Sequence, residues 1–271
     1  VTNGTFTRNA ATANGGAVYN IAANAVTYAG TTFGDGTAAG ANTARNGGAI
    51  YNENGSTTNL TAGTTFNTNT AAASGGAIYN AGALNTTDGT TVFTSNSAAD
   101  GGAVYNADGG VLTTTATTYN TNSVTGAGGA INNIGNLVST TDTFAGNRSA
   151  NGGAIYNATN GNAAVTTGTF TANTASANGG AINNSSTAVP LVITTSSFGN
   201  GIAAGANSAN KGGAIYNANR ATTTVVGPTT FNVNNATEGG AIYNEGTLTT
   251  DAATSRDRRL TRREAKDISS T

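Results

Sequence analysis

Apolar side chains return along this chain at two fixed places in a repeating unit. The first place is a β-branched residue within the six-residue segment Gly-Gly-Ala-(Ile/Val)-(Tyr/Asn)-Asn, which occurs nine times, starting at Gly15, Gly47, Gly75, Gly101, Gly128, Gly152, Gly179, Gly212 and Gly239. Successive copies start 24 to 33 residues apart. The second place is one aromatic residue per unit, at Phe6, Phe33, Phe66, Phe93, Tyr119, Phe144, Phe170, Phe198 and Phe231. A period of roughly 20 to 50 residues predicts a solenoid, a propeller or an array.

The six-residue segment alternates in a way that predicts a short strand. Side chains along a strand point to opposite faces in turn, so Val18 lies on one face while Ala17 and Tyr19 lie on the other. The position of Val18 holds only Ile or Val in the nine copies, which is typical of a core position. The position of Tyr19 holds Tyr in seven copies and Asn in two, Asn132 and Asn183, which favours a solvent-facing side chain.

Each unit has room for three short strands. The Gly pair and the next aromatic residue are 16 to 19 positions apart, and this part holds an Asn- and Gly-rich turn and a Thr-rich strand such as Leu191–Thr194. Three strands and three polar corners make one coil of a parallel β-helix, whereas a propeller blade needs roughly 40 to 50 residues and the Gly, Thr and Asn content opposes helices. We therefore predict an all-β fold over residues 1–254: a single-stranded parallel β-helix (β-solenoid) of about nine coils with three short strands per coil.

Equivalent residues of stacked coils lie above one another at the interstrand spacing of about 4.8 Å. We therefore expect the aromatic residues to form one stack in the core. The last residue of each six-residue segment is expected to form an asparagine ladder, whose amides bond to one another and to backbone groups at the corner. The members of this ladder are Asn20, Asn52, Asn80, Asn106, Asn133, Asn157, Asn184, Asn217 and Asn244.

The composition narrows the class of protein. Gly makes up 39 of 271 residues, and Ala, Thr and Asn dominate the rest. Such bias is also typical of disordered chains, but a disordered chain has no reason to keep its Ile/Val and Phe positions in register.

Charged residues make up 8% and the formal net charge is −1, which argues against a nucleic-acid partner. No apolar run approaches the roughly 18 residues of a membrane span, and the start at Val1 indicates a processed or excised segment.

The chain offers little chemistry for catalysis. It contains no His and no Cys, so it has no imidazole or thiolate for a triad or a metal site. Its few acidic residues do not recur at one position of neighbouring units as a catalytic pair. We therefore predict no enzymatic activity, with no catalytic, cofactor-binding or metal-binding residue. The outward Thr positions before the aromatic residues lack a second regular column beside them, which argues against an ice-binding face.

Two features favour contact with a partner. The tyrosines of the repeated segment form a stripe that suits stacking on sugars or on a neighbouring protein, although a ladder that only stabilises the sheet explains it equally well. Two units carry an insertion of about five residues at the same place, in the nearly alike segments 34–42 and 199–207. Loops at one corner of a solenoid often form its binding face, and a tolerated insertion or a relic of duplication is the alternative.

The two ends depart from the repeat. The chain starts almost inside a coil, and residues 255–271 form a basic tail with six of the 11 Lys and Arg residues and three of the 12 acidic residues. We expect this tail to pack on its own last coil or on a neighbouring subunit. Head-to-tail stacking into a filament would join the open first strand of one subunit to the next. The expected subunit contacts are Val1, Arg256, Arg258, Arg259, Leu260, Arg262, Arg263 and Ile268.

The pairing of Phe66-Asn67-Thr68-Asn69 with Gly75-Gly76-Ala77-Ile78 resembles the repeat of chlamydial polymorphic membrane proteins and related bacterial autotransporter passengers, over residues 1 to about 250. The resemblance implies a secreted or surface-displayed right-handed β-helix, commonly an adhesin. We accordingly expect a non-enzymatic extracellular structural or adhesive solenoid on a bacterial surface, self-assembling head to tail. A carbohydrate-binding or carbohydrate-cleaving β-helix and a monomeric adhesin passenger domain are the alternatives. A host or matrix glycan or protein is the expected outside partner.

Overall fold

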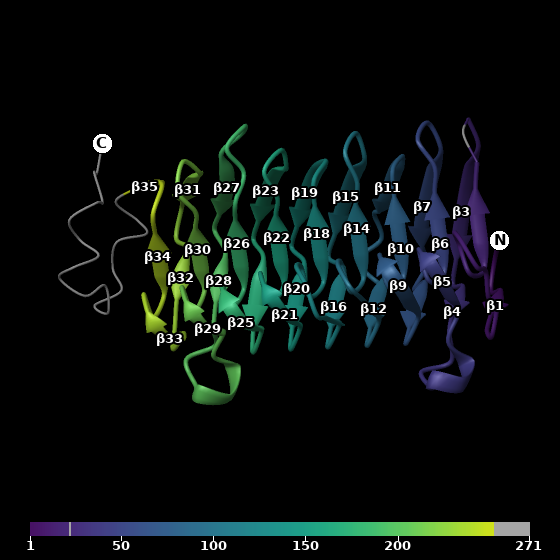
Figure 1. The fold of residues 1–271 in the computed structure, drawn as a ribbon, viewed down its shortest axis with the longest axis horizontal. Helices are drawn as coiled ribbons and strands as arrows, with labels where there is room; N and C mark the ends of the chain where they lie inside the picture. Colours follow the sequence, from purple (N-terminus) through teal and green to yellow (C-terminus); the bar gives the residue numbers. More distant parts are fainter. Residues whose placement is uncertain (22, 252–271) are drawn as a thin grey trace.

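The computed structural model describes residues 1–21 and 23–251, which wind into an elongated rod of stacked coils (Figure 1). Every strand pair is parallel, and each strand inside the rod pairs with its equivalents in the coils before and after it. Three of the sheets contain nine strands, one from each coil. The predicted parallel β-solenoid of nine coils is therefore confirmed.

Four sheets run along the rod. The aromatic sheet contains β1 (Thr5–Phe6), β4 (Thr32–Phe33), β8 (Thr65–Asn67), β12 (Val92–Thr94), β16 (Thr118–Asn120), β20 (Thr143–Ala145), β24 (Thr169–Thr171), β28 (Ser197–Phe198) and β32 (Thr230–Phe231). The motif sheet follows the Gly pairs and contains β2 (Val18–Asn20), β6 (Ile50–Asn52), β10 (Ile78–Asn80), β14 (Val104–Asn106), β18 (Ile131–Asn133), β22 (Ile155–Asn157), β26 (Ile182–Asn184), β30 (Ile215–Asn217) and β34 (Ile242–Asn244).

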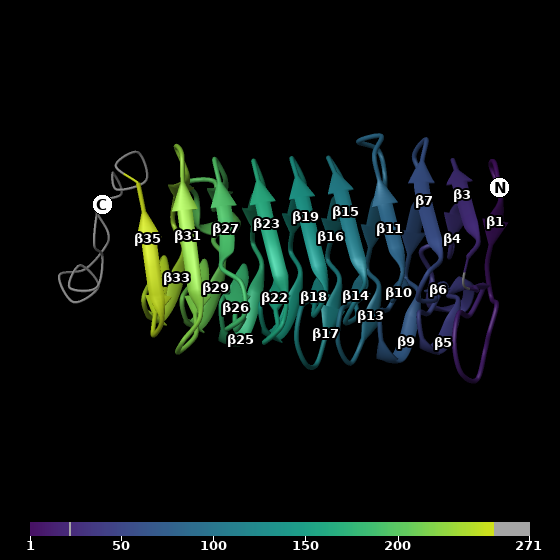
Figure 2. The same ribbon diagram turned by 90° about the horizontal axis from the view of Figure 1, so that it is seen from above.

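The long-strand sheet is seen along the rod in Figure 2. It contains β3 (Ala25–Ala29), β7 (Thr57–Thr61), β11 (Ala83–Thr86), β15 (Val111–Thr115), β19 (Asn136–Thr140), β23 (Asn162–Thr166), β27 (Leu191–Thr194), β31 (Thr222–Val226) and β35 (Thr247–Thr250). The fourth sheet contains β5 (Thr43–Asn46), β9 (Thr70–Ser74), β13 (Ser97–Ala98), β17 (Ser123–Val124), β21 (Arg148–Asn151), β25 (Thr174–Asn178), β29 (Ser208–Lys211) and β33 (Asn235–Glu238).

The fourth sheet adds one further strand to the predicted three in eight of the nine coils. It lies between the aromatic strand and the Gly pair, in segments of small residues such as Thr70–Ser74 that show no alternation of large apolar residues. Its ladder is interrupted by register shifts, for example between Ser149 and Asn151. The first coil contributes only isolated bridges, such as Ala10 with Thr43. Pairing with neighbouring coils, and not side-chain pattern, makes these segments strands.

The core consists of aligned columns of like side chains. Phe33, Phe66, Phe93, Tyr119, Phe144, Phe170 and Phe198 are fully buried, and the ring centroids of the whole aromatic stack lie 4.7 to 5.1 Å from their neighbours. The Ile/Val column of the motif sheet is buried beside it. Each such side chain contributes about 1.5–3 kcal/mol of burial free energy, as an upper estimate.

The Gly pair brings neighbouring coils into close backbone contact. Gly101 has φ +63°, a left-handed conformation that a side chain opposes. A Cβ on Gly102 would lie 2.1 Å from the carbonyl oxygen of Gly129 in the next coil. The following Ala103 is buried, contrary to the predicted alternation, because the N–H groups of Ala103 and Val104 both donate to Ala130 O at 2.9 Å. Regular alternation therefore begins only at Val104.

Two asparagine ladders run inside the corners. In the first ladder, which begins at Asn20, each Nδ2 donates to the Oδ1 of the next member, over all eight steps to Asn244. Asn80, for example, donates to Asn106 Oδ1 at 2.8 Å and to Val111 O at 3.1 Å. The second ladder lies at the corner after the aromatic strands and consists of Asn9, Asn42, Asn69, Asn96, Asn122, Asn147, Asn173, Asn207 and Asn234. Both ladders satisfy backbone groups that face the interior.

Candidate functional site: the tyrosine column and the corner loops

The outer face of the motif sheet carries the tyrosine column, which we define as Tyr19, Tyr51, Tyr79, Tyr105, Asn132, Tyr156, Asn183, Tyr216 and Tyr243. The strands place these residues in register on successive coils. The four stacked pairs (19/51, 51/79, 79/105 and 216/243) have centroid distances of 4.7 to 5.7 Å. Tyr19 is 44% exposed, and the other tyrosines of the column are half-buried. Their rings therefore support one another and still offer an edge to solvent.

Asn132 and Asn183 interrupt the column and are buried, with 5% and 2% exposure. This corrects the prediction that the whole position faces solvent. An Asn side chain reaches less far from the sheet than the Tyr rings on the neighbouring coils, so those rings and the surrounding chain cover it. Asn183 Oδ1 accepts a hydrogen bond from Ser185 Oγ at 2.9 Å, whereas the buried Oδ1 of Asn132 has no hydrogen-bond partner.

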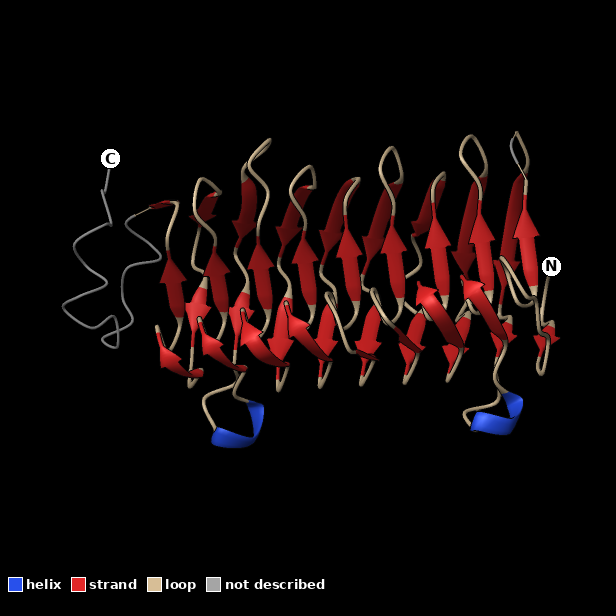
Figure 3. Cartoon of the chain, viewed as in Figure 1, coloured by secondary structure: helices blue, strands red, loops and turns tan. Residues whose placement is uncertain are grey.

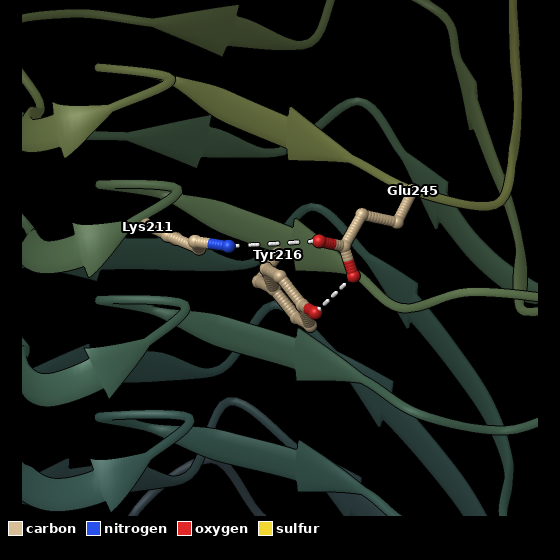
Figure 4. A network of polar contacts seen from close by, with 3 residues as sticks. All are labelled: Lys211, Tyr216 and Glu245. Atoms are coloured by element: carbon tan, nitrogen blue, oxygen red, sulfur yellow. Dashed lines mark hydrogen bonds and ion pairs between the residues drawn. The ribbon is translucent and has the colours of Figure 1, made fainter.

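Charged side chains hold the column near its C-terminal end (Figure 4). The Tyr216 hydroxyl donates to Glu245 Oε2 at 2.5 Å, and Lys211 Nζ lies 3.6 Å from Glu245 Oε1. Lys211 Nζ also lies 4.6 Å from the centre of the Tyr243 ring. Burial, followed by the hydrogen bond to Glu245 and its charge, raises the pKa of the Tyr216 hydroxyl well above its usual range. Figure 4 shows the three side chains converging across neighbouring coils.

A similar contact lies at the other end of the column. The Tyr19 hydroxyl donates to Glu53 Oε1 at 3.2 Å, again from one coil to the next. Burial and the contact with Glu53 raise the pKa of the Tyr19 hydroxyl. Tyr rings with an apolar body and a polar tip can stack on sugar rings or pack against another protein. The column is thus a possible contact face as well as a stabilising ladder.

Two corner loops, residues 34–42 and 199–207, project from the same side of the rod (Figure 3). Each contains a single turn of 3₁₀-helix, η1 (Ala38–Gly40) and η2 (Ala203–Gly205). The first two glycines of each loop have left-handed φ angles, +78° and +86° in the first loop and +80° and +86° in the second. The loops follow β4 and β28, the second and eighth strands of the aromatic sheet. Six rungs therefore separate them, or about 29 Å at the interstrand spacing.

Each loop is fixed by an Asp or Asn near its start. Asp35 Oδ1 accepts hydrogen bonds from Thr37 N at 2.8 Å and Thr37 Oγ1 at 2.7 Å, and these bonds lower the pKa of the Asp35 carboxyl. Asn200 Oδ1 accepts from Ile202 N at 3.2 Å. The side chain of Ile202 is 60% exposed at the tip of the second loop. Two copies of one ordered loop thus present different side chains, Thr37 and Ile202, at equivalent positions.

The second asparagine ladder passes through both loops. Phe33 and Phe198 lack the Asn found three residues after the other aromatics, but Asn42 and Asn207 at the ends of the loops take its place. Counting back from the Gly pairs finds an Asn five or six residues earlier in all nine units. This spacing from the Gly pairs locates every member of the second ladder in the sequence. Spacing from the aromatic residues misses Asn42 and Asn207.

The remaining predicted positions fall elsewhere. Val1 is 56% exposed, and its ammonium group donates to Thr27 O at 2.7 Å. The predicted tail contacts between Arg256 and Ile268 lie outside the described residues. In the described part of the chain, no group of three or more acidic side chains is placed to hold a metal ion. None of the helices in residues 1–21 and 23–251 is long and apolar enough to cross a membrane.

Comparison with known proteins identifies the repeat. The family model of the Chlamydia polymorphic membrane protein repeat matches residues 3–21, 63–81, 90–107 and 143–158. Each match runs from an aromatic strand through the following Gly pair and motif strand. No curated protein and no solved structure matches the chain. The chain therefore carries, at four of its coils, the repeat of the Chlamydia polymorphic membrane proteins, and its solenoid fits a surface-type repeat protein.

Proposed function

We propose that this chain is a non-enzymatic extracellular rod of a bacterial surface, which makes adhesive contacts through its corner loops and tyrosine column. The observation that carries the proposal is the pair of alike loops on one side of the rod. Ordered loops on a rigid scaffold are where proteins place binding residues. The matched repeat supports placement at a bacterial surface.

The shape and chemistry of these faces suit a glycan or protein partner. The loops offer Thr37, Ile202 and exposed backbone, and the column offers half-buried Tyr rings with hydroxyl groups. Stacking of sugars or apolar side chains on such rings contributes binding free energy without a deep pocket. Contact at two loops about 29 Å apart adds avidity when one partner reaches both.

Binding to an array of glycans and matrix proteins tests the proposal. The test compares the natural chain with a variant that lacks residues 36–41 and 201–206, and with Tyr79→Ala in the column. We expect loss of binding in the loop variant and weaker binding in Tyr79→Ala, with circular dichroism unchanged. Binding that survives loss of both loops would contradict a role for the loops, and release of reducing sugar from a bound polysaccharide would favour the carbohydrate-cleaving alternative.

Self-association is a second candidate, favoured by the first rung. The strands β1 and β2 each have a hydrogen-bonded strand partner on one side only in the described chain, whereas the free side of β3 is covered by Val1–Asn3. Phe6 at this rung is only half-buried, and the next ring, Phe33, covers one of its faces. A second copy that stacks its last rung here would continue the sheets and the aromatic column. Electron microscopy should then show fibres, whereas monodisperse single rods at high concentration and low salt would support a monomeric adhesin.

A further inference from the structure

Three adjacent rungs of the long-strand sheet replace apolar core residues with hydroxyl groups. The inward column reads Leu60, Thr86, Thr114, Ser139 and Val165 in successive coils, in register. All five side chains are at most 1% exposed. Hydroxyl groups in a core need partners, because burial without a hydrogen bond costs free energy. A polar group must therefore face the middle of the rod.

That partner is Asp142, which has 0% exposure. Its Oδ1 accepts a hydrogen bond from Thr117 N at 2.7 Å, and its Oδ2 accepts from Ser139 Oγ at 2.6 Å and from Thr114 Oγ1. Thr86 Oγ1 and Thr117 Oγ1 share a further bond at 2.5 Å. We call this set the central hydroxyl cluster: Thr86, Thr114, Thr117, Ser139 and Asp142.

The fold does not require a carboxyl group at this place. The equivalent position, two residues before the aromatic, holds Thr or Ser in most coils. A hydroxyl there accepts the same backbone hydrogen bond, as Thr229 Oγ1 does from Ser196 N at 3.2 Å. In the next coil the position is Gly168, which has no side chain that could hydrogen-bond the carboxyl. Asp142 therefore adds something that a threonine would not.

Among the residues that the structure describes, no positive charge lies against the carboxyl. The strands around it, β15, β19, β20, β23 and β24, contain no Lys, Arg, Asp or Glu. The titratable group that faces it is Tyr119 of β16, which is fully buried and whose hydroxyl interacts with the Thr114 hydroxyl without a well-aligned hydrogen bond. Burial and the Asp142 charge raise the pKa of Tyr119 well above its usual range, so it stays neutral. A buried carboxylate without a cation favours its protonated form.

We propose that the central hydroxyl cluster is a proton-binding site, and that proton uptake by Asp142 stabilises the middle rungs of the rod. A proton from solvent forms an O–H bond on the carboxyl group, which then donates to a hydroxyl oxygen of Thr114 or Ser139 where the carboxylate only accepted. The hydroxyl proton freed on Thr114 can then turn toward the neighbouring Tyr119 hydroxyl oxygen.

The direction of the effect follows from the titration. Burial raises the pKa of Asp142 to about 6, against the lowering effect of its three hydrogen bonds. The folded state thus binds the proton more tightly than the unfolded chain, where the pKa is close to 3.8. The stabilising contribution is complete below the unfolded value and is lost as the pH rises through about 6.

Carbon-13 NMR of the Asp142 carboxyl in the whole chain tests the proposal directly. We expect a midpoint near 6, together with pH-dependent protection of the Thr117 amide from hydrogen exchange, after correction for intrinsic rates. Between pH 4 and 7 the folding equilibrium constant of the natural chain should fall on the order of 50-fold more than that of Asp142→Thr. Asp108→Asn, at an exposed turn, is the matched control and should behave like the natural chain.

Two results would overturn the proposal. A carboxyl midpoint close to 4 in the folded chain would show that the site does not favour the proton, and this measurement does not depend on the variant folding. A midpoint that moves when Na⁺ replaces K⁺ at constant ionic strength would assign the site to a metal cation instead.

Discussion

Asn42 Nδ2 donates to Asn69 Oδ1 at 2.9 Å, although Asn42 follows its aromatic residue by nine positions and Asn69 follows its own by three. The corner therefore fixes where the asparagine lies in space and leaves the length of chain before it free. The extra residues of the loop project outward and do not disturb the ladder (Figure 3).

Removal of the loops should leave the rod intact. Deleting residues 36–41 and 201–206 joins Asp35 to Asn42 and Asn200 to Asn207, which restores the spacing of the other coils. We expect unfolding free energy within about 1 kcal/mol of the natural chain, because loop closure depends weakly on length. Urea unfolding measures this, and a large loss of stability would show that the loops support the coil.

Interruption of the second ladder should be costly. Asn122 Oδ1 accepts from Asn96 N and Asn96 Nδ2, both at 3.0 Å, and Asn122 Nδ2 donates to Phe93 O and Asn147 Oδ1. Asn122→Ala leaves several buried groups unpaired, and we expect a loss of about 2–4 kcal/mol in urea unfolding. Asn136→Ala, at an exposed position of β19, is the control and should cost under about 0.5 kcal/mol. Equal effects of the two variants would refute the structural role of the ladder.

The second glycine of the repeated segment should tolerate a methyl group only at the end of the rod. A Cβ on Gly102 meets the Gly129 carbonyl oxygen at 2.1 Å, whereas a Cβ on Gly240 in the last coil has its nearest neighbour at 3.6 Å. We expect Gly102→Ala to lower the unfolding free energy by about 2–3 kcal/mol. Thermal unfolding of both variants measures the difference, and Gly240→Ala should leave the unfolding free energy nearly unchanged. A benign Gly102→Ala would mean that the coils can separate locally.

A tyrosine at position 132 should complete the tyrosine column. The neighbouring coils present Tyr105 and Tyr156 in register, and the lost amide oxygen has no partner. We expect Asn132→Tyr to raise the unfolding free energy by about 0.5–1 kcal/mol through stacking. Asn132→Ala separates the effect of losing the amide from that of adding the ring. A lower melting temperature for Asn132→Tyr would show that the buried amide is needed.

The alkaline titration of Tyr216 should depend on Glu245. Burial is the largest cause of the raised pKa of Tyr216. The hydrogen bond to Glu245 and the charge of its carboxylate come next, and both disfavour the phenolate. Because the folded pKa is raised, the contribution of this tyrosine to stability is lost only as the pH rises above the unfolded value of 10. In difference absorbance titrations against Tyr216→Phe, Glu245→Gln should lower the pKa of Tyr216, while Glu53→Gln should leave it unchanged.

The sequence predicts the coil because its strongest constraints repeat. The aromatic and Ile/Val positions accept few residue types, so the stack from Phe6 to Phe231 and the first asparagine ladder can be located from spacing alone. The fourth sheet could not be located in this way, since strands such as Ser97–Ala98 hold small residues whose pairing is set by the neighbouring coils. The burial of Ala103 was also missed, because it depends on two N–H groups that share one carbonyl.

The candidate contact faces were only partly predictable. Sequence indicates the two insertions and the tyrosine stripe, but not that Asn132 and Asn183 are covered by their surroundings. The isolated Asp142 gave no signal in a search for paired carboxylates, since its partners are hydroxyl groups on other coils. Such a site becomes visible only when the register of the coils is known.

The regular stacking has a consequence for the distance between the corner loops. Both loops are anchored to rungs, so their separation can change only in whole steps of one interstrand spacing, about 4.8 Å. Loss of one complete unit, for example residues 101–127, would shorten the rod by a single step and keep every column continuous. Repeat number thus acts as a molecular ruler that sets how far apart the two loops stand.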